Sequence, residues 1–470
     1  MKILITGATG LIGHEVGKAL VREGHTVTII SRNKAKAQTE IPFPCDVIEG
    51  DLLQRPIVDP RLREIEGVLH LLGENVGEAR WTQDKKKKIL DSRVLGTRNL
   101  IASLKQSEAV RLQVFISASA IGFYGDRGDE VLTEESIPGQ DFLSGVCTQW
   151  ESEATAARKC FPDLRIAILR LGVVLSPFGG ALTKMLTPFR LGLGACLGNG
   201  EQWLSWIDLA DVAGIVTWVL RNPQTSGILN AVSPMQVRNR EFSKFLAAAF
   251  QKGLAPSLPK FALKIILGEM SGLLLGSQRV RPKRLLEMGY QFREPDLKKV
   301  FGRVASFFEN GEMLLRSEQY LPSKRDQVFP FFSDARNLET ITPAMLRFQI
   351  TGVSTKEVMA GTLIDYRLKI RGVPVTWRTR IDQWNPSENF IDSQFKGPYR
   401  KWQHLHSFED LGEGTLMTDT VRYKVPLGWM GWFTAGWMVS RDINGIFRYR
   451  RQVCARQDFN SLKRSPKDPA

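Results

Sequence analysis

The stretch "ITGATGLIG" near the N-terminus constrains the fold more than any other part of the sequence. Gly7, Gly10 and Gly13 recur every third residue, between the apolar run "KILI" and a helical pattern that extends from Leu11 to Glu23. Glycines at this spacing let the backbone turn tightly from a strand into a helix and approach a pyrophosphate, whose charge the helix N-terminus stabilises. The segment therefore predicts the opening strand and helix of a dinucleotide-binding βαβ unit.

Short apolar runs alternate with helical patterns after this motif. The runs are "TVTIISR", "DVIEGDL", "GVLHLLG", "LQVFISASA" and "RIAILRLGVVLS", and helical patterns cover about 84–106 and 145–160. Strands that alternate with helices indicate parallel pairing, so we expect an α/β fold with a doubly wound parallel sheet. A Gly- and Pro-rich region that extends to about residue 205 is expected to form a small substrate subdomain. Its glycine turns and the segment "WLSWID" either line a substrate cleft or are structural.

The end of the second strand indicates which dinucleotide is bound. An acidic residue there would accept a hydrogen bond from the ribose 2′-hydroxyl of NAD, but this strand ends in Ser31 and Arg32. An arginine favours the 2′-phosphate and hence NADP, unless Arg32 simply faces solvent. Asp51 and Leu52 should lie near the adenine, and Gly73 near the nicotinamide side. The predicted cofactor contacts are Gly7, Thr9, Gly10, Leu11, Ile12, Gly13, Ser31, Arg32, Asp51, Leu52 and Gly73.

The sequence pattern changes near residue 308, which predicts two domains, 1–308 and 309–470. From there apolar and polar residues mostly alternate, as in an antiparallel sheet with one buried face. A helix over about 433–455 would place Val439, Ile443, Ile446, Phe447 and Cys454 on one apolar stripe. The second domain is therefore predicted to be α+β.

Several ordered motifs of residues 1–302 resemble a known family. "ITGATGLIG", "HLLGENV", "SRVLGTRNL", "FISASAIGFYGDRG" and "RLGVVLSPFGGAL" are similar to motifs of the extended short-chain dehydrogenase/reductases, within the NAD-dependent epimerase/dehydratase superfamily. "DEVLTEES", "WLSWIDLADVAG" and the element at about 254–302 resemble the atypical group called epimerase family proteins. The resemblance implies a Rossmann fold and nicotinamide-dependent oxidoreductase or epimerase chemistry.

The resemblance also implies a catalytic Tyr-x-x-x-Lys pair, which this sequence lacks. Cys147 and Glu151 stand at the corresponding positions, and the pattern at Tyr320 contains a proline and lies beyond the domain boundary. Ser119, with Ser117 as the alternative, supplies a hydroxyl near the nicotinamide, and Tyr124 is either an acid/base or a packed ring. The candidate catalytic residues are Ser119, Tyr124, Cys147 and Glu151.

Residues 309–470 resemble the START-like ligand-binding superfamily (SRPBCC, polyketide cyclase/dehydrase type). The resemblance implies a helix-grip fold, in which an apolar small molecule is held between a curved sheet and the terminal helix. His404 and His406 alternate along one strand and should face the same side, where they could polarise a ligand carbonyl. Because no acidic or cysteine partner stands at a useful spacing, no metal site is predicted. The aromatic segment 428–438 is interpreted as a cap of the cavity or a domain contact, or alternatively as a membrane-surface contact.

Charge and cysteine content limit the remaining classes of function. The formal net charge of +15 is spread evenly, with +7 in residues 311–470 (24 Lys and Arg against 17 Asp and Glu) and +8 in the rest. An even spread without a recognised motif argues against a nucleic-acid-binding protein. No run of about 18 apolar residues predicts a transmembrane segment. Five scattered cysteines and an N-terminus without signal-peptide features predict a cytoplasmic protein with reduced thiols. Homo-oligomer formation is left open.

Two functions from different classes remain after the sequence analysis. The first is an NADP-dependent oxidoreductase or epimerase that acts on an apolar small molecule. The second is a catalytically impaired NADP(H)-binding regulatory protein, since the resemblance extends to proteins labelled as cell-division inhibitors.

Overall fold

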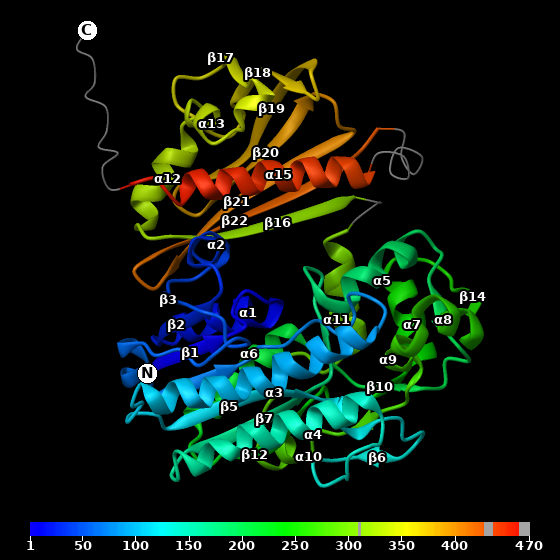
Figure 1. Cartoon of the computed structure of the whole chain (residues 1–470). Coiled ribbons are helices and arrows are strands. Elements are labelled where there is room, and N and C mark those ends of the chain that lie inside the picture. Colours follow the sequence, from blue (N-terminus) through cyan, green and yellow to red (C-terminus); the bar gives the residue numbers. More distant parts are fainter. Residues whose placement is uncertain (309–311, 427–435, 460–470) are drawn as a thin grey trace. The chain divides into compact units, whose positions relative to one another are not determined.

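The computed structural model describes residues 1–308, 312–426 and 436–459 (Figure 1). The chain divides into two compact units, one of residues 1–34 and 45–307, the other of residues 308–470 together with 35–44. Most of the aromatic segment 428–438 lies outside the described residues. Among the described residues no helix is both long and apolar enough to cross a membrane.

The N-terminal unit is built on a seven-stranded sheet with strand order β12-β7-β5-β4-β1-β2-β3, and every pairing in it is parallel. The sheet and its Rossmann-like strand order agree with the α/β prediction. Its strands are β1 (Lys2–Thr6), β2 (Thr26–Ser31), β3 (Asp46–Glu49), β4 (Gly67–His70), β5 (Val114–Ala120), β7 (Arg165–Leu171) and β12 (Gly227–Ala231).

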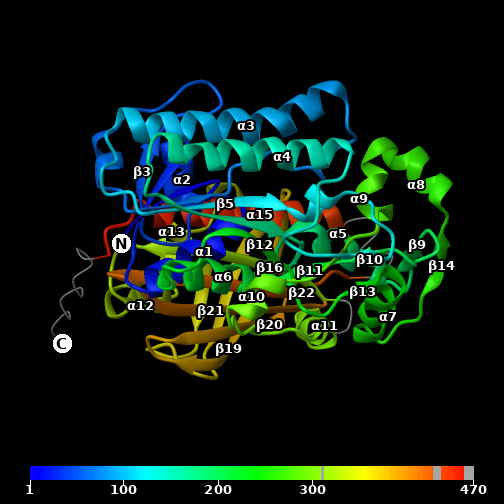
Figure 2. The same ribbon diagram turned by 90° about the horizontal axis from the view of Figure 1, so that it is seen from below.

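Helices cover both faces of this sheet. Figure 2 shows α3 (Gln83–Gln106) and α4 (Phe142–Thr155) on one face, and α1 (Leu11–Arg22) and α6 (Leu209–Arg221) on the other. The central strands are therefore buried on both sides, which explains why most of their residues are apolar. His70 at the end of β4 is a polar exception, and it contacts Thr6 Oγ1 at 2.7 Å and Thr97 Oγ1 at 2.9 Å.

The run "RIAILRLGVVLS" differs from the single strand that its apolar residues predict. It forms β7 and then β8 (Val173–Leu175), which leaves the main sheet and pairs with β11 (Trp206–Asp208). Gly172 lies between them, and a Cβ there would stand 2.8 Å from the Ser205 carbonyl oxygen. A glycine allows the chain to change sheets at this close backbone approach.

Shorter elements complete the N-terminal unit. They are α5 (Gly180–Arg190), α7 (Asn239–Ala249), α8 (Lys260–Leu267), α9 (Gly272–Leu275), α10 (Lys283–Glu287), α11 (Leu297–Ser306), and the short strands β6 (Val131–Leu132), β9 (Ala195–Leu197), β10 (Trp203–Leu204), β13 (Val237–Arg238), β14 (Ala255–Leu258) and β15 (Arg279–Val280). The helix α2 (Lys34–Glu40) belongs to the segment that is grouped with the second unit.

The second unit contains a separate seven-stranded antiparallel sheet, as the alternating pattern predicts, with strand order β16-β22-β21-β20-β19-β18-β17. The strands are β16 (Met313–Leu321), β17 (Gln349–Val353), β18 (Leu363–Ile370), β19 (Val373–Asn385), β20 (Asn389–Lys396), β21 (Lys401–Leu411) and β22 (Gly414–Lys424). The long helix α15 (Trp437–Cys454) crosses one face of this sheet, and α12 (Arg325–Ser333) and α13 (Asn337–Thr340) lie at one end of it (Figure 1).

The buried stripe of α15 differs from its prediction, because Val439 and Ile446 are only half-buried. Ile443, Phe447 and Cys454 are buried as expected, but the same stripe also buries Arg450, which is 7% exposed. A buried guanidinium requires partners. It therefore marks a polar site on the inner face of the unit.

Candidate functional site

The loop after β1 has a conformation that favours glycine. Gly7 has a φ of 72°, and a Cβ at this position would lie 2.7 Å from the Leu71 carbonyl group. A Cβ on Gly13 would lie 2.6 Å from the Ala8 backbone. Glycine is thus required at these positions because the loop lies close to the chain that follows β4, and the start of α1 lies close to the loop.

The N-terminus of α1 is open to a bound anion. Gly10 is the N-cap and offers no side chain to the first backbone N–H groups, and the first turn holds no acidic residue. Thr9 and Gly10 are exposed, and Leu11 and Ile12 are half-buried. Strand order reverses at β1, between β2 and β4, which is where open parallel sheets bind their ligands. The loop therefore has the shape and the electrostatics of a pyrophosphate cradle.

The other predicted cofactor residues follow strands whose carboxyl ends meet at this same edge. Arg32 follows β2, is exposed, and makes no ion pair within the described part of the chain. Asp51, after β3, accepts a hydrogen bond from Leu53 N at 2.9 Å and thereby fixes its own turn, and Leu52 is buried. Gly73, after β4, is exposed.

Two of these positions have local partners of their own. Ser31 at the end of β2 donates to the Asn33 carbonyl oxygen at 3.2 Å. A Cβ on Gly73 would lie 3.1 Å from the Arg93 guanidinium, so the chain there runs close over this side chain.

The stretch that would carry a catalytic tyrosine and lysine contains a buried ion pair instead. Glu151 on α4 accepts two hydrogen bonds from Arg170 on β7, one from Nε to Oε1 and one from Nη2 to Oε2, each at 2.8 Å. Arg170 is 1% exposed and Glu151 8% exposed. A bidentate pair of this kind is among the strongest charge-assisted contacts in proteins.

The predicted catalytic residues Ser119 and Tyr124 are attached to this pair. Ser119 Oγ donates to Glu151 Oε1 at 2.6 Å, whereas the Ser117 hydroxyl donates to the neighbouring Ala118 carbonyl at 3.1 Å. Ser119 is therefore the serine that faces α4. Tyr124 OH donates to Asn230 Oδ1 at 2.7 Å and accepts from Arg170 Nη1 at 3.0 Å. We call Ser119, Tyr124, Glu151, Arg170 and Asn230 the Glu151 cluster.

The environment of Tyr124 is unfavourable for proton transfer. The residue is fully buried, and burial raises the pKa of its phenol in spite of the nearby Arg170. The tyrosine of the Tyr-x-x-x-Lys pair works in the opposite way, because a neighbouring ammonium lowers its pKa. The packing interpretation of this ring is therefore favoured.

Cys147 occupies the expected tyrosine position as an inert thiol. It is 4% exposed, and burial, together with the charge of Glu151, raises the pKa of its thiol to about 11. Reactive cysteines need a stabilised thiolate and some exposure. Its surroundings provide neither.

Sequence reasoning missed Arg170, although a signal for it exists. The arginine stands within the apolar run "RIAILRLGVV", directly after four buried positions of β7. An arginine in such a strand needs a buried acid, and Glu151 in the stretch "CTQWESEA" is a suitable partner. Glu151 and Arg170 are 19 residues apart in the sequence, and the packing of α4 against β7 brings them together.

Part of the predicted substrate cleft is structural. Trp206 is fully buried, and its indole N–H donates to the Met235 carbonyl oxygen at 2.8 Å. Asp208 caps α6 through a hydrogen bond from Ala210 N at 2.8 Å. The segment "WLSWID" is thus held within the core for much of its length.

The second unit encloses a cavity of about 670 Å³ between its sheet and α15. Its walls are mostly apolar and aromatic, with Ile364, Leu368, Trp377, Phe390, Val439 and Phe447 among them. This volume falls in the range of small-molecule sites, which is about 300–1,000 Å³.

A group of buried polar side chains interrupts the apolar part of the wall. His404 and His406 face the same side of β21, as predicted, with ring centroids 3.7 Å apart. The prediction that they lack acidic partners is wrong, because Asp392 on β20 and Asp419 on β22 contact both rings. These partners stand 12 and 15 residues from His404 in sequence and come close only through cross-strand pairing. Asp392, His404, His406, Asp419 and Arg450 form what we call the His404 cluster.

Burial dominates the electrostatics of this cluster. It lowers the pKa of His404 to about 4. Burial opposes the ionisation of Asp419, but the charge of Arg450 and hydrogen bonds from the two histidines hold its pKa well below the ordinary value. The cluster therefore keeps a buried carboxylate beside a guanidinium at the cavity wall.

The fold and the glycine loop define a Rossmann fold of the dinucleotide-binding class. The NAD dependent epimerase/dehydratase family matches residues 3–231, and a domain of unknown function, DUF1731, matches residues 258–304. The chain belongs to the NAD dependent epimerase/dehydratase family, in the group of the epimerase family proteins.

Two curated relatives and one solved structure define this membership. The chain is 35% identical over 297 residues to the chloroplastic epimerase family protein SDR39U1 homolog of Arabidopsis thaliana, which covers 62% of this chain and 83% of the relative. It is 34% identical over 302 residues to epimerase family protein Mb2239 of Mycobacterium bovis, covering 64% and 96%. The crystal structure of human epimerase family protein SDR39U1 with NADPH matches at 31% identity and a TM-score of 0.58, covering 65% of this chain and 99% of that one.

Proposed function

We propose that the chain binds NADPH through its N-terminal unit and acts as an oxidoreductase or epimerase-like protein on an apolar small molecule held in the cavity of its second unit. The observation that carries this proposal is the pairing, in one chain, of a glycine-lined loop that no side chain fills with a largely apolar cavity of about 670 Å³.

The preference for NADPH is supported by the end of β2. Arg32 is exposed there and unpaired within the described residues, so its guanidinium is available for a 2′-phosphate. The strand carries no acidic side chain for a ribose 2′-hydroxyl. The human relative was crystallised with NADPH, which supports the same choice.

A START-like helix-grip is supported by the arrangement of the second unit. An antiparallel sheet faces a long C-terminal helix, and the cavity is lined by strands β18–β21 and α15. The aromatic walls fit an apolar ligand, and the His404 cluster would contact its polar end.

NADPH, when bound, would supply a hydride at its nicotinamide ring. The Ser119 hydroxyl is committed to Glu151, and Tyr124 is committed to Asn230 and Arg170. These residues orient one another and are buried. A proton donor of the usual phenol type is therefore not provided by the Glu151 cluster.

That observation favours a second candidate function. A chain that binds NADPH but holds its catalytic positions in a closed ion-pair network could serve as a regulatory protein that responds to NADPH and to the apolar ligand. The two candidates share both binding sites and differ only in turnover.

The first experiment extracts the small molecules that copurify with the full-length protein and identifies them by mass spectrometry. NADPH oxidation is then followed with the extracted apolar compound and with a panel of apolar carbonyl compounds. We expect a nucleotide and an apolar compound in the extract. Turnover supports the oxidoreductase, and binding of both without turnover supports the regulatory protein. If the extract contains neither a nucleotide nor an apolar compound, and titrations detect no binding of either, both candidate functions are contradicted.

A cavity-filling variant tests the site of the apolar ligand. Leu368→Trp places an indole in the cavity and should reduce binding of the extracted compound at least tenfold, a change of about 1.4 kcal/mol. Val373→Trp, at a position that is 63% exposed on the neighbouring strand, is the matched control and should bind normally. Equal binding by both variants would place the ligand elsewhere.

A further inference from the structure

The His404 cluster contains a set of metal-ligating atoms at the cavity wall. The sheet register puts Asp392 directly opposite His404, and His406 directly opposite Asp419, on adjacent antiparallel strands. All four side chains therefore emerge on the same face, within reach of one another.

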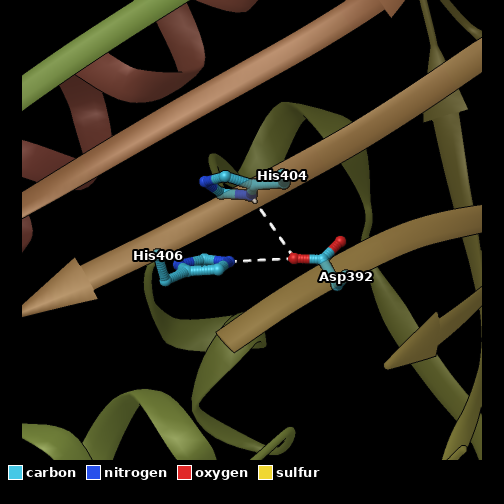
Figure 3. A group of neighbouring side chains, drawn as sticks. All are labelled: Asp392, His404 and His406. Carbon is cyan, nitrogen blue, oxygen red and sulfur yellow. Dashed lines mark hydrogen bonds and ion pairs between the residues drawn. The ribbon is translucent and has the colours of Figure 1, made fainter. Parts of the chain in front are cut away.

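One nitrogen of each imidazole faces the same oxygen of Asp392. His406 Nε2 lies 2.9 Å and His404 Nδ1 3.6 Å from the same oxygen of Asp392, Oδ2 (Figure 3). The ligand atoms of the three residues all lie within 4.8 Å of one another. Ligands bound at about 2.0–2.2 Å around one tetrahedral ion are separated by about 3.3–3.6 Å, so the three side chains would have to shift slightly to hold an ion between them.

The other two imidazole nitrogens face a second carboxylate. His404 Nε2 and His406 Nδ1 lie 2.9 and 3.1 Å from Asp419 Oδ1. Histidines that bind metals almost always donate their remaining ring N–H to such an acceptor, which fixes the tautomer. Arg450 Nη2 lies 3.5 Å from Asp419 Oδ1, so the guanidinium neutralises the charge of this second carboxylate.

The protons of the two imidazoles can be arranged in two ways, one that favours a bound ion and one that does not need it. With one N–H on each ring, two N–H groups serve four ring nitrogens that lie near carboxylate oxygens. If Asp419 accepts both N–H groups, two nitrogen lone pairs face Asp392. A cation between them removes that repulsion. In the competing arrangement without an ion, His406 Nδ1 accepts from Arg450 Nη2 at 3.3 Å and His406 Nε2 donates to Asp392.

We propose that Asp392, His404 and His406 bind a divalent first-row transition metal ion at the wall of the cavity, with Asp419 and Arg450 orienting the histidines. Two imidazoles and one carboxylate suit zinc and its neighbours in the series rather than calcium or magnesium. All three ligands line the cavity, so the remaining coordination positions face its interior. There the ion would bind an oxygen of the ligand, such as a carbonyl or a carboxylate, while the aromatic walls hold its apolar part.

This inference rests on the cavity of the proposed function but requires neither NADPH nor the apolar ligand. The test uses the full-length protein without a polyhistidine tag, stripped with a chelator and titrated with Zn²⁺ in a calorimeter. We expect one Zn²⁺ per chain at this site, and visible d–d absorption when Co²⁺ is added instead. Failure of the Zn²⁺ titration would leave NADPH and apolar-ligand binding untouched, so the two proposals fail separately.

Matched variants locate the ion. Asp419→Asn should weaken Zn²⁺ binding about 10- to 100-fold, and Asp392→Asn should weaken it further. Asp365→Asn is the control, because this aspartate stands on β18 of the same sheet, pairs with Arg378 at 2.7 Å and lies outside the cavity lining. It should bind Zn²⁺ like the wild type.

The inference is overturned if the wild type binds no more Zn²⁺ than Asp392→Asn, or if Asp365→Asn loses as much. Circular dichroism shows whether each variant folds. Should Asp392→Asn fail to fold, the Co²⁺ spectrum of the wild type decides. Absence of d–d absorption at saturating Co²⁺ then excludes the site.

Discussion

Each of the two units buries a cluster of charged side chains. The clusters differ in whether other protein groups satisfy their polar atoms. In the Glu151 cluster both carboxylate oxygens of Glu151, the Tyr124 hydroxyl and the Ser119 hydroxyl all have partners from the protein. In the His404 cluster four of the five side chains line a cavity, and His404 Nδ1 faces Asp392 Oδ2 at 3.6 Å, which is longer than a hydrogen bond. We therefore interpret the Glu151 cluster, whose polar groups are satisfied by one another, as a structural element. The His404 cluster, which borders a cavity, is interpreted as a binding site.

The largest expected effect is loss of the closed ion pair. Arg170→Met leaves the Glu151 carboxylate buried without its partner, which should lower the free energy of unfolding by about 3–5 kcal/mol. The double variant Glu151→Gln with Arg170→Met should recover most of that loss. Chemical denaturation measures both. Arg98→Ala, which removes an exposed ion pair with Glu153, is the control and should change stability by about 1 kcal/mol or less. If Arg170→Met lowers the free energy of unfolding by no more than Arg98→Ala does, the Glu151 cluster does not stabilise the fold through this ion pair.

The next effect concerns the nucleotide loop. Gly7→Ala forces a side chain into a left-handed backbone conformation against Leu71, a strain of about 1–3 kcal/mol. NADPH affinity, measured by fluorescence titration, should fall at least about tenfold. Gly302→Ala on α11 meets no atom within 4 Å and should leave affinity unchanged. Normal affinity in Gly7→Ala would show that the loop does not hold the nucleotide.

A smaller effect is expected from Tyr124→Phe. It removes the hydroxyl that links Asn230 and Arg170, and should lower the free energy of unfolding by about 1–3 kcal/mol. If the protein oxidises NADPH, the variant should retain its turnover number. A loss of turnover without a loss of stability would make Tyr124 a catalytic residue and would open the Glu151 cluster to chemistry.

The smallest effect is expected at Cys147. Because its pKa is raised to about 11, the thiol stays protonated at about pH 8.5, where an ordinary cysteine is half ionised. Iodoacetamide should therefore modify Cys147 in the folded protein far more slowly than after denaturation, as read by mass spectrometry of peptides. Equal rates would show that this position is accessible and reactive.

The sequence patterns predicted the two sheets, because strand formation follows from the order of apolar and polar residues along short segments. The parallel sheet follows from its apolar runs and from the glycine spacing, and the antiparallel sheet follows from alternation along β18–β22. The break at Gly172 and the burial of Trp206 were not apparent, because each depends on which distant backbone lies alongside. The partners of Glu151 and of His404 were missed for the same reason. Arg170 and Asp419 come close to them only when strands pair and helices pack.

The most direct test of the account is calorimetric titration of the full-length protein with NADPH and with NADH. We predict one NADPH site per chain and a clear preference over NADH. Arg32→Ala should weaken NADPH binding about 10- to 100-fold, the worth of a hydrogen bond to a charged group, and leave NADH binding unchanged. Absence of binding to either nucleotide, or an Arg32→Ala variant that binds NADPH as tightly as the wild type, would contradict the account.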